Sequence, residues 1–261
     1  MYNNYTDFIS SIIKKESISD INFKSTSDYN SILEHVTFDD GNRYIKYIKQ
    51  FFPKITYNHV LEFVSINDKY GIPKKDHFTF SDGELLFCSS TSLRYIFHSM
   101  IILRYYEHKI LCKNIVEVGC GYGGLFLGIC YFSKVFNIEI ENYYFIDLPE
   151  ICGLIKKYLE LHKDLINIKY SIHSAYNYGS DIDNNNLFFI SNYCFTEILS
   201  EYRNKYIETL FPKISHGFII WQTIFNVPIE NVNMINKKPE KIVEEIPQTA
   251  SKEKKNYFVY F

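Results

Sequence analysis

The sequence predicts an α/β fold with a mostly parallel sheet, and three observations support this prediction. The first is a strand-like run, a glycine-rich turn and a helical segment that follow each other from residue 114 onward. The second is the continued alternation of apolar strand-like runs with helical segments, which is typical of parallel sheets covered by helices. The third is a pair of strand-like segments at 241–246 and 257–261, as expected for an antiparallel edge hairpin.

The glycine-rich turn is the feature around which the other elements are organised. Ile115, Val116 and Val118 form a short apolar, β-branched run that indicates a buried strand. Glycine lets the backbone bend sharply and approach a ligand beside the N-terminus of a helix. Because four glycines so close together lower stability, a turn that binds a ligand is favoured over a turn that binds none. The glycines occupy positions 119, 121, 123 and 124.

The spacing of these glycines does not by itself choose the ligand. Gly119, Gly121 and Gly124 satisfy the G-x-G-x-x-G dinucleotide pattern, which is weak in isolation. Together with Glu117, the stretch reads Glu-x-Gly-x-Gly-x-Gly and resembles motif I of the class I S-adenosylmethionine (SAM) methyltransferases. That resemblance implies that Glu117 lies near the methionine amino group and that the glycines make room for the rest of the cofactor.

The segments after the glycine unit continue the alternation. Residues 143–147 are predicted to form a second strand that ends in the carboxylate of Asp147, and Pro149 suits the first turn of the next helix. Asp147 lies 28 residues beyond Gly119, somewhat more than the ~20 expected for an acidic ribose ligand. Further strands are predicted at 167–172, 187–192 and 216–221, and further helices at 149–163 and 196–211.

The region before the glycine unit contains no glycine loop and reads as helical pieces. Apolar side chains at helical spacing, from Tyr44 onward, predict a helix that Pro53 stops. We expect residues 1–87 to form a helical cap or an oligomerisation region. In the second case, the protein would be a homodimer. Residues 88–261 are expected to form the catalytic domain.

A largely apolar helix is predicted over Leu93–Tyr106, with N-cap candidates among residues 89–92. Arg94 and His98 lie four residues apart on one face of this helix. Because the helix immediately precedes the glycine strand, this face could reach the ligand. Each of the two is equally well interpreted as a residue at the edge of the core with a local hydrogen bond.

Composition argues against several classes of protein. A net charge of −2 does not suit nucleic-acid binding. The N-terminus does not read as a signal peptide, and no apolar stretch approaches membrane-spanning length, so we expect a cytoplasmic protein without membrane insertion. The six cysteines have neither C-x-x-C nor His/Cys ligand spacing, and neither a metal site nor a disulfide framework is predicted.

From Thr91 to the C-terminus, the chain resembles the sugar O-methyltransferases, a branch of the class I SAM-dependent fold. The resemblance implies a Rossmann-like methyltransferase core after the helical N-terminal region. It also implies SAM as the cofactor and an oxygen of a sugar or of a glycan or capsule precursor as the methyl acceptor. The matching stretches are Leu93–His98, Glu117–Gly124, Phe145–Glu150, Ser191–Glu197 and Glu245–Pro247.

The predicted site combines this resemblance with the positions of the strand ends. A neutral hydroxyl acceptor needs a base within hydrogen-bond reach, and acceptors in open α/β sheets lie at the carboxyl edge. Glu197 is the preferred base and His98 the second, with Asn192 beside them, and Tyr193 and Tyr95 are expected to contact the acceptor. The expected cofactor-binding residues are Glu117, Gly119, Gly121, Gly123, Asp147, Leu148, Arg94 and Ser191.

Alternatives remain open at the level of sequence. Glu197 is equally interpreted as a carboxylate favoured by a helix N-terminus, and an anionic phosphate or phosphoramidate acceptor would need no base. A non-catalytic SAM-binding module would carry the same motifs. An NAD-dependent sugar-modifying enzyme is disfavoured, because the Tyr-x-x-x-Lys match at 70–74 is interrupted by Gly71 and Pro73.

Overall fold

The computed structural model describes residues 3–30, 35–109, 111–225, 227–250 and 253–261. This described part of the chain divides into two compact units. The first unit consists of Met1–Leu103, Gly121–Asn137 and Gly153–Asn167, and the second of Arg104–Cys120, Ile138–Cys152 and Ile168–Phe261. The division runs through the glycine turn itself, and a domain boundary between residues 87 and 88 stays a prediction.

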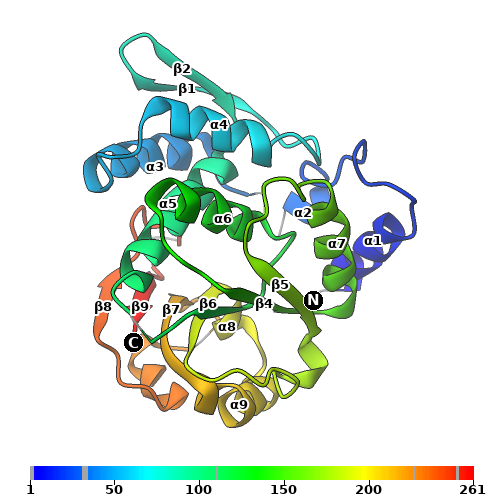
Figure 1. Cartoon of the computed structure of the whole chain (residues 1–261), viewed down its shortest axis with the longest axis vertical. Helices are drawn as coiled ribbons and strands as arrows, with labels where there is room; N and C mark the ends of the chain where they lie inside the picture. Colours follow the sequence, from blue (N-terminus) through cyan, green and yellow to red (C-terminus); the bar gives the residue numbers. More distant parts are fainter. Residues whose placement is uncertain (1–2, 31–34, 110, 226, 251–252) are drawn as a thin grey trace. The chain divides into compact units, whose positions relative to one another are not determined.

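The second unit is built on one sheet, with strands β3 (Asn114–Val118), β4 (Asn142–Asp147), β5 (Lys169–Ser174), β6 (Leu187–Asn192), β7 (Ile214–Gln222), β8 (Lys241–Glu244) and β9 (Asn256–Tyr260). Within the described residues, the strands pair in the order β5-β4-β3-β6-β7-β9-β8 (Figure 1). β3 to β7 run parallel, whereas β9 is antiparallel to both β7 and β8. The predicted Rossmann-like fold, a mostly parallel sheet with an antiparallel C-terminal edge, is confirmed.

A buried aromatic cluster lies against β6 and β7. Residues 187–190 of β6 are fully buried, as expected for a continuous apolar run in a parallel strand. Phe189 packs on Phe195 and Phe211, and the Trp221 indole donates to the Val227 carbonyl oxygen at 2.9 Å. The buried indole N–H is therefore satisfied, and the cluster fixes the carboxyl ends of both strands.

The prediction of one helix over 196–211 is wrong, because the chain forms two helices there, α8 (Cys194–Glu197) and α9 (Ser200–Thr209). Ile198 and Leu199 are extended between them. Ile198 packs against the buried cluster of the sheet, and its carbonyl oxygen accepts a hydrogen bond from the Arg203 guanidinium at 3.0 Å. Tertiary packing has therefore overridden the local helical pattern. The 3₁₀ turns are η1 (Ala175–Asn177), η2 (Phe211–Lys213) and η3 (Ile229–Ile235).

The first unit is largely helical. Its elements are α1 (Asn3–Ile13), α2 (Ser27–Asn30), α3 (Phe38–Phe51), α4 (Tyr57–Asn67), β1 (Asp76–Ser81), β2 (Glu84–Cys88) and α6 (Gly124–Phe136), while α5 (Ser90–Tyr106) and α7 (Pro149–Glu160) belong partly to each unit. α5 begins as predicted, because the Ser89 hydroxyl accepts from the Ser92 amide at 3.1 Å. No helix in the described ranges combines the length and the apolar character that a bilayer crossing requires.

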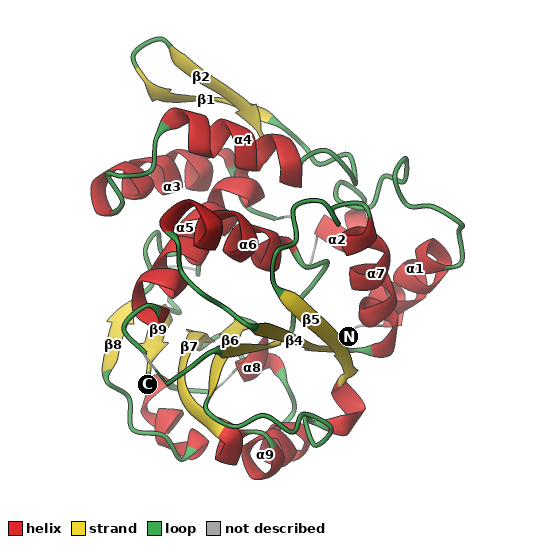
Figure 2. Ribbon diagram, viewed as in Figure 1, coloured by secondary structure: helices red, strands yellow, loops and turns green. Residues whose placement is uncertain are grey.

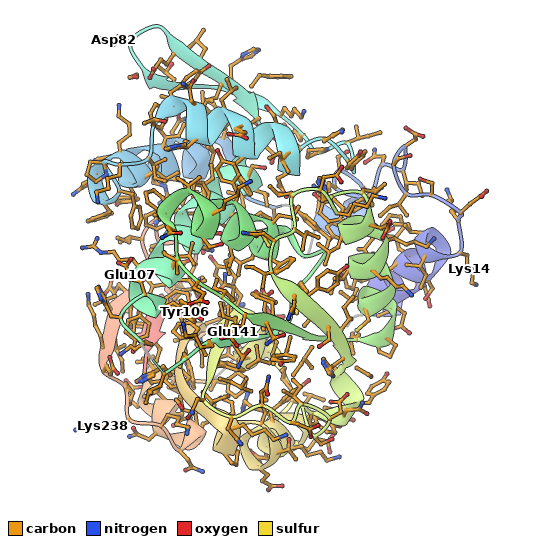
Figure 3. All side chains as sticks on the ribbon, in the orientation of Figure 1. Lys14, Asp82, Tyr106, Glu107, Glu141 and Lys238 are labelled. Carbon is orange, nitrogen blue, oxygen red and sulfur yellow. The ribbon has the colours of Figure 1, made fainter. Side chains whose placement is uncertain are left out.

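The expectation of helical pieces alone before residue 88 is wrong for residues 76–88, where β1 and β2 form an antiparallel hairpin (Figure 2). Phe78, Phe80 and Leu86 are buried on one face of the hairpin, with exposed residues between them. Asp82 lies at the hairpin tip (Figure 3), followed by Gly83 with a φ of 78°. An Asp-Gly pair between two alternating runs is a hairpin signal, so the sequence did contain this information.

Candidate functional site

The glycine turn follows the carboxyl end of β3, and its backbone has a conformation that only glycine adopts readily. Gly119, Gly121 and Gly123 have φ values of 81°, 56° and 90°. A Cβ on Gly119 would also overlap the Cβ and Sγ atoms of Cys194. A side chain at position 119 is therefore excluded both by the backbone and by its neighbour. The contact also shows that the segment after β6 lies directly against the glycine turn.

Asp147 ends β4, the strand next to β3, and its carboxylate binds the glycine turn. One oxygen accepts from the Cys120 amide at 2.6 Å, and the other accepts from the Leu148 amide at 2.8 Å. The structure therefore brings Asp147 and Leu148 to the turn, as the sequence analysis expected. Their role in holding a cofactor stays a prediction.

Glu117 is a buried carboxyl group one residue before the end of β3. Only 2% of the residue is exposed, and the Tyr143 hydroxyl donates to it at 2.7 Å. Burial raises the pKa of Glu117 to about 8, the hydrogen bond from Tyr143 opposes this shift, and the charge of Asp147 adds to it. Such a carboxyl group holds its proton at neutral pH, and a cationic ligand beside it would favour the ionised form.

The turn after β6 carries the residues assigned to the acceptor side. Ser191 is fully buried and its hydroxyl donates to the Val118 carbonyl oxygen at 2.8 Å, so it joins β6 to β3. Asn192 ends β6, and Tyr193 follows with φ 69° and ψ −35°. A residue with a side chain pays roughly 1–3 kcal/mol for such a conformation. Strain of this kind is concentrated at functional sites, which makes Tyr193 a candidate.

Two hydrogen bonds from the Gln222 side-chain amide hold this turn. It donates to the Tyr193 carbonyl oxygen at 3.1 Å and to the Glu197 carboxylate at 2.7 Å. Glu197 is half-buried and ends a four-residue helix instead of opening a long one. Because α8 is a single turn, Glu197 lies both in its first turn and at its end, and the interpretation as a carboxylate favoured by a helix N-terminus stays open.

Glu245 received no role in the sequence analysis, although it begins the matching stretch Glu245–Pro247. It is 1% exposed and accepts a hydrogen bond from the Tyr193 hydroxyl. Its second oxygen accepts from the Thr249 amide and hydroxyl at 3.0 and 2.7 Å and from the Asn256 side chain at 3.0 Å. No local pattern reveals this contact, because Tyr193 and Glu245 are 52 residues apart.

Arg94, Tyr95 and His98 belong to the first unit, whereas the sheet-edge residues belong to the second. The Arg94 guanidinium lies 5.7 Å from the centre of the Tyr95 ring. His98 is 1% exposed, and burial, together with the charge of Arg94, lowers its pKa well below its ordinary value. His98 is therefore neutral and weakly basic at neutral pH. The assignment of all three to the same site as the sheet edge stays a prediction.

A buried network in the first unit supports the glycine turn through Tyr122. The Lys24 ammonium lies 4.2 Å from the centre of the Tyr122 ring and donates to the Asn67 carbonyl oxygen at 2.5 Å and the Tyr158 hydroxyl at 3.0 Å. The Asn67 amide donates to the Tyr122 hydroxyl at 3.2 Å. Residues from the first 87 thus hold a residue of the glycine turn. The sequence alone did not indicate this network, because a lysine is ordinarily exposed.

The chain was compared with protein-family models, with curated proteins and with solved structures. No family model matches the chain, and no curated protein is significantly similar in sequence. Magnesium protoporphyrin IX methyltransferase from Synechocystis, solved with SAM, is 9% identical, with a TM-score of 0.47 over 86% of this chain and 97% of that one. An S-adenosylmethionine-dependent methyltransferase from Clostridium acetobutylicum is also 9% identical, with a TM-score of 0.44 over 82% and 95%. The fold assignment rests on the strand order of the chain itself.

Proposed function

We propose that the chain is a SAM-dependent O-methyltransferase acting on a sugar or glycan precursor. The observation that carries this proposal is the buried Glu117 carboxyl group, with a pKa of about 8, at the end of the strand that enters the glycine turn. A buried acid is costly unless a cation or a hydrogen bond stabilises its charge. The ammonium group of a methionine moiety would supply that cation.

The residues at the β3 and β4 ends fit such a cofactor. The positive φ angles of the turn leave room for close approach of a ligand, and Glu117 would accept the ammonium group. Asp147 would hold the ribose hydroxyls, because it is the acidic residue at the end of the strand next to the glycine turn. SAM, when bound, supplies a methyl group already activated by a sulfonium, so the chain has mainly to align the acceptor oxygen with it.

The acceptor would lie at the carboxyl ends of β6 and β7, where open α/β sheets bind their ligands. Asn192, Tyr193 and Glu197 are at this edge, and Glu197 remains the base that the sequence favours. The sugar class of acceptor rests on the resemblance alone. A phosphate-like acceptor would use the same cofactor half and would need no base.

Calorimetry with SAM tests the cofactor assignment. Asp147→Ala should weaken SAM binding by ~1–3 kcal/mol, since it strands hydrogen-bond partners at a partly buried site. Asp183→Ala, which removes an exposed carboxylate of the same unit, is the matched control and should bind like the wild type. Equal affinity in the two variants would remove Asp147 from the ribose role, and no SAM binding by the wild type would refute the proposed function.

A further inference from the structure

We propose that Tyr193 and Glu245 together accept the proton of the methyl acceptor's hydroxyl group. Tyr193 is the catalytic residue that touches the acceptor, and Glu245 is the positioning residue that acts through it. This inference rests on the proposed function and goes beyond it, because it assigns the proton acceptor and the protonation state of the substrate.

The first support is the location of Tyr193. It follows the carboxyl end of β6, and the next residue, Cys194, lies against Gly119 of the glycine turn. Its amide donates to the Ile220 carbonyl oxygen at 3.1 Å, and its carbonyl oxygen accepts from Gln222. The strained turn is thus held from β7, and Tyr193 remains half-buried beside the predicted cofactor site.

The second support is the environment of Glu245. The carboxyl group is too deeply buried to meet an acceptor itself, and the Tyr193 hydroxyl is bonded to it. The groups that face it are Tyr193 from the turn after β6, Thr249 from the loop after β8 and Asn256 from β9. Burial raises the pKa of Glu245, and these hydrogen bonds oppose the shift. A base works best when its pKa lies near the operating pH.

The chemistry balances without an additional reagent. The acceptor hydroxyl donates its proton to the Tyr193 oxygen while the phenol proton passes to Glu245, which ends protonated. The acceptor oxygen forms its new bond to carbon, and the electron pair of the broken carbon–sulfur bond stays on sulfur. An acceptor that is already anionic has no proton to give, so this pair favours a neutral hydroxyl over a phosphate.

The same turn contains the competing base, Glu197, but its geometry differs. Glu197 accepts a hydrogen bond from Gln222, the side chain that also fixes the Tyr193 carbonyl. Glu197 therefore has a structural part in holding the turn. Tyr193 projects a hydroxyl group that is bonded to a buried carboxyl, which is the arrangement of a base and the group that orients it.

A titration of the full-length protein tests the pair without any acceptor. The protein is labelled with ¹³C at the tyrosine Cζ, and Tyr193→Phe identifies the Tyr193 signal. We expect this signal to shift in a step as Glu245 titrates above its ordinary pKa, and the step to vanish in Glu245→Gln. Glu244→Gln, which removes the adjacent exposed carboxylate paired with Lys255, should keep the step. A Tyr193 signal that stays flat between about pH 5 and pH 9 would overturn the proposal.

Thr249→Val keeps the test decisive if Glu245→Gln does not fold. Without the Thr249 hydroxyl, the charged form of Glu245 loses a donor, so the midpoint of the step should move to higher pH. A purely structural role of the pair would leave the methyl-transfer rate insensitive to this shift. An unmoved midpoint would count against Glu245 as the titrating group.

Methyl transfer from tritiated SAM to a panel of methyl glycosides gives the catalytic readout. Tyr193→Phe and Glu245→Gln should lose roughly 10²–10⁴-fold in rate with SAM affinity intact, while Glu244→Gln keeps the wild-type rate. In Thr249→Val, the acid limb of the pH–rate profile should move up with the Tyr193 step. A loss of rate confined to Glu197→Gln would assign the proton acceptor to Glu197 instead. SAM binding without methyl transfer to any glycoside would reject the proposed role of Tyr193 and Glu245. Wild-type protein that binds no SAM would instead refute the proposed function.

Discussion

At the β3 and β4 ends of the sheet edge, the site is made of glycines, main-chain amides and two carboxyl groups close to a single turn. At the β6 and β7 ends, it is made of side chains from distant parts of the sequence, such as Tyr193 with Glu245 and Gln222 with Glu197. The first, the cofactor half, consists mainly of consecutive residues around one turn, whereas the second, the acceptor half, consists of side chains that meet from separate segments. We expect changes in one half to leave the function of the other intact, and the following predictions test this separation.

The largest effect is expected for Gly119→Ala. The backbone at position 119 has a positive φ, which an alanine adopts only with strain, and the new Cβ would overlap Cys194. The protein should therefore lose roughly 2–6 kcal/mol of stability together with its SAM binding. Gly83→Ala is the matched control, because Gly83 has a similar φ of 78° but open space around it. It should lose only ~1–2 kcal/mol, the cost of the conformation alone. Chemical denaturation measures both, and an equal loss in the two would show that the contact with Cys194 is unimportant.

Glu117→Gln should act in opposite directions on binding and on stability. SAM binding should weaken by ~1.5–3 kcal/mol, since a charged hydrogen bond is lost. The folded pKa of Glu117, about 8, lies above its ordinary value of 4.5, so the stability that it contributes is complete below pH 4.5 and is lost as the pH rises towards 8. The wild type should therefore lose up to ~1.4 kcal/mol per pH unit relative to the variant in that window. Parallel stability curves for the two proteins would refute the raised pKa.

The smallest effect on the cofactor half is expected for Gln222→Ala. Removing the side-chain amide deletes its hydrogen bonds to Tyr193 and Glu197, which should cost ~1–2 kcal/mol of stability. SAM affinity should stay within about twofold of the wild type, because both of these hydrogen bonds lie in the acceptor half. Calorimetry that found a SAM affinity as low as in Asp147→Ala would show that the two halves are coupled.

The same difference explains what the sequence could predict. Strand, glycine turn and helix are consecutive, so Glu117, the glycines and Asp147 could be placed together from local pattern and the parallel pairing of β3 with β4. The mostly parallel sheet followed from the alternation of elements and the antiparallel edge from the two strand-like terminal segments, whereas the order of the strands was not predicted. Glu245 could be marked as part of a motif but not given a partner, because its contact depends on how β8 and β9 fold back beside β7.

The local sequence pattern also gave wrong predictions where tertiary packing determines the conformation of the backbone. Ile198 fits a helix by sequence, but its burial against the sheet cluster breaks the segment and moves Glu197 to a helix end. Lys24 reads as a surface charge, yet it lies buried over the Tyr122 ring. The hairpin at 76–88 is a different case, because the Asp82-Gly83 turn between its strands is a local signal that the sequence itself contains.

The proposed function depends above all on Glu117, which we expect to receive the ammonium group of SAM at the glycine turn. Calorimetric titration of SAM, with NAD as the rival ligand, tests it most directly between about pH 6 and 7.5, below the ~7.7–8.0 typical of α-amino groups. Binding must remove the Glu117 proton, so SAM affinity should rise by up to about tenfold per pH unit in the wild type and stay flat in Glu117→Gln. NAD binding in place of SAM, or a wild-type SAM affinity that does not change with pH, would contradict the claim.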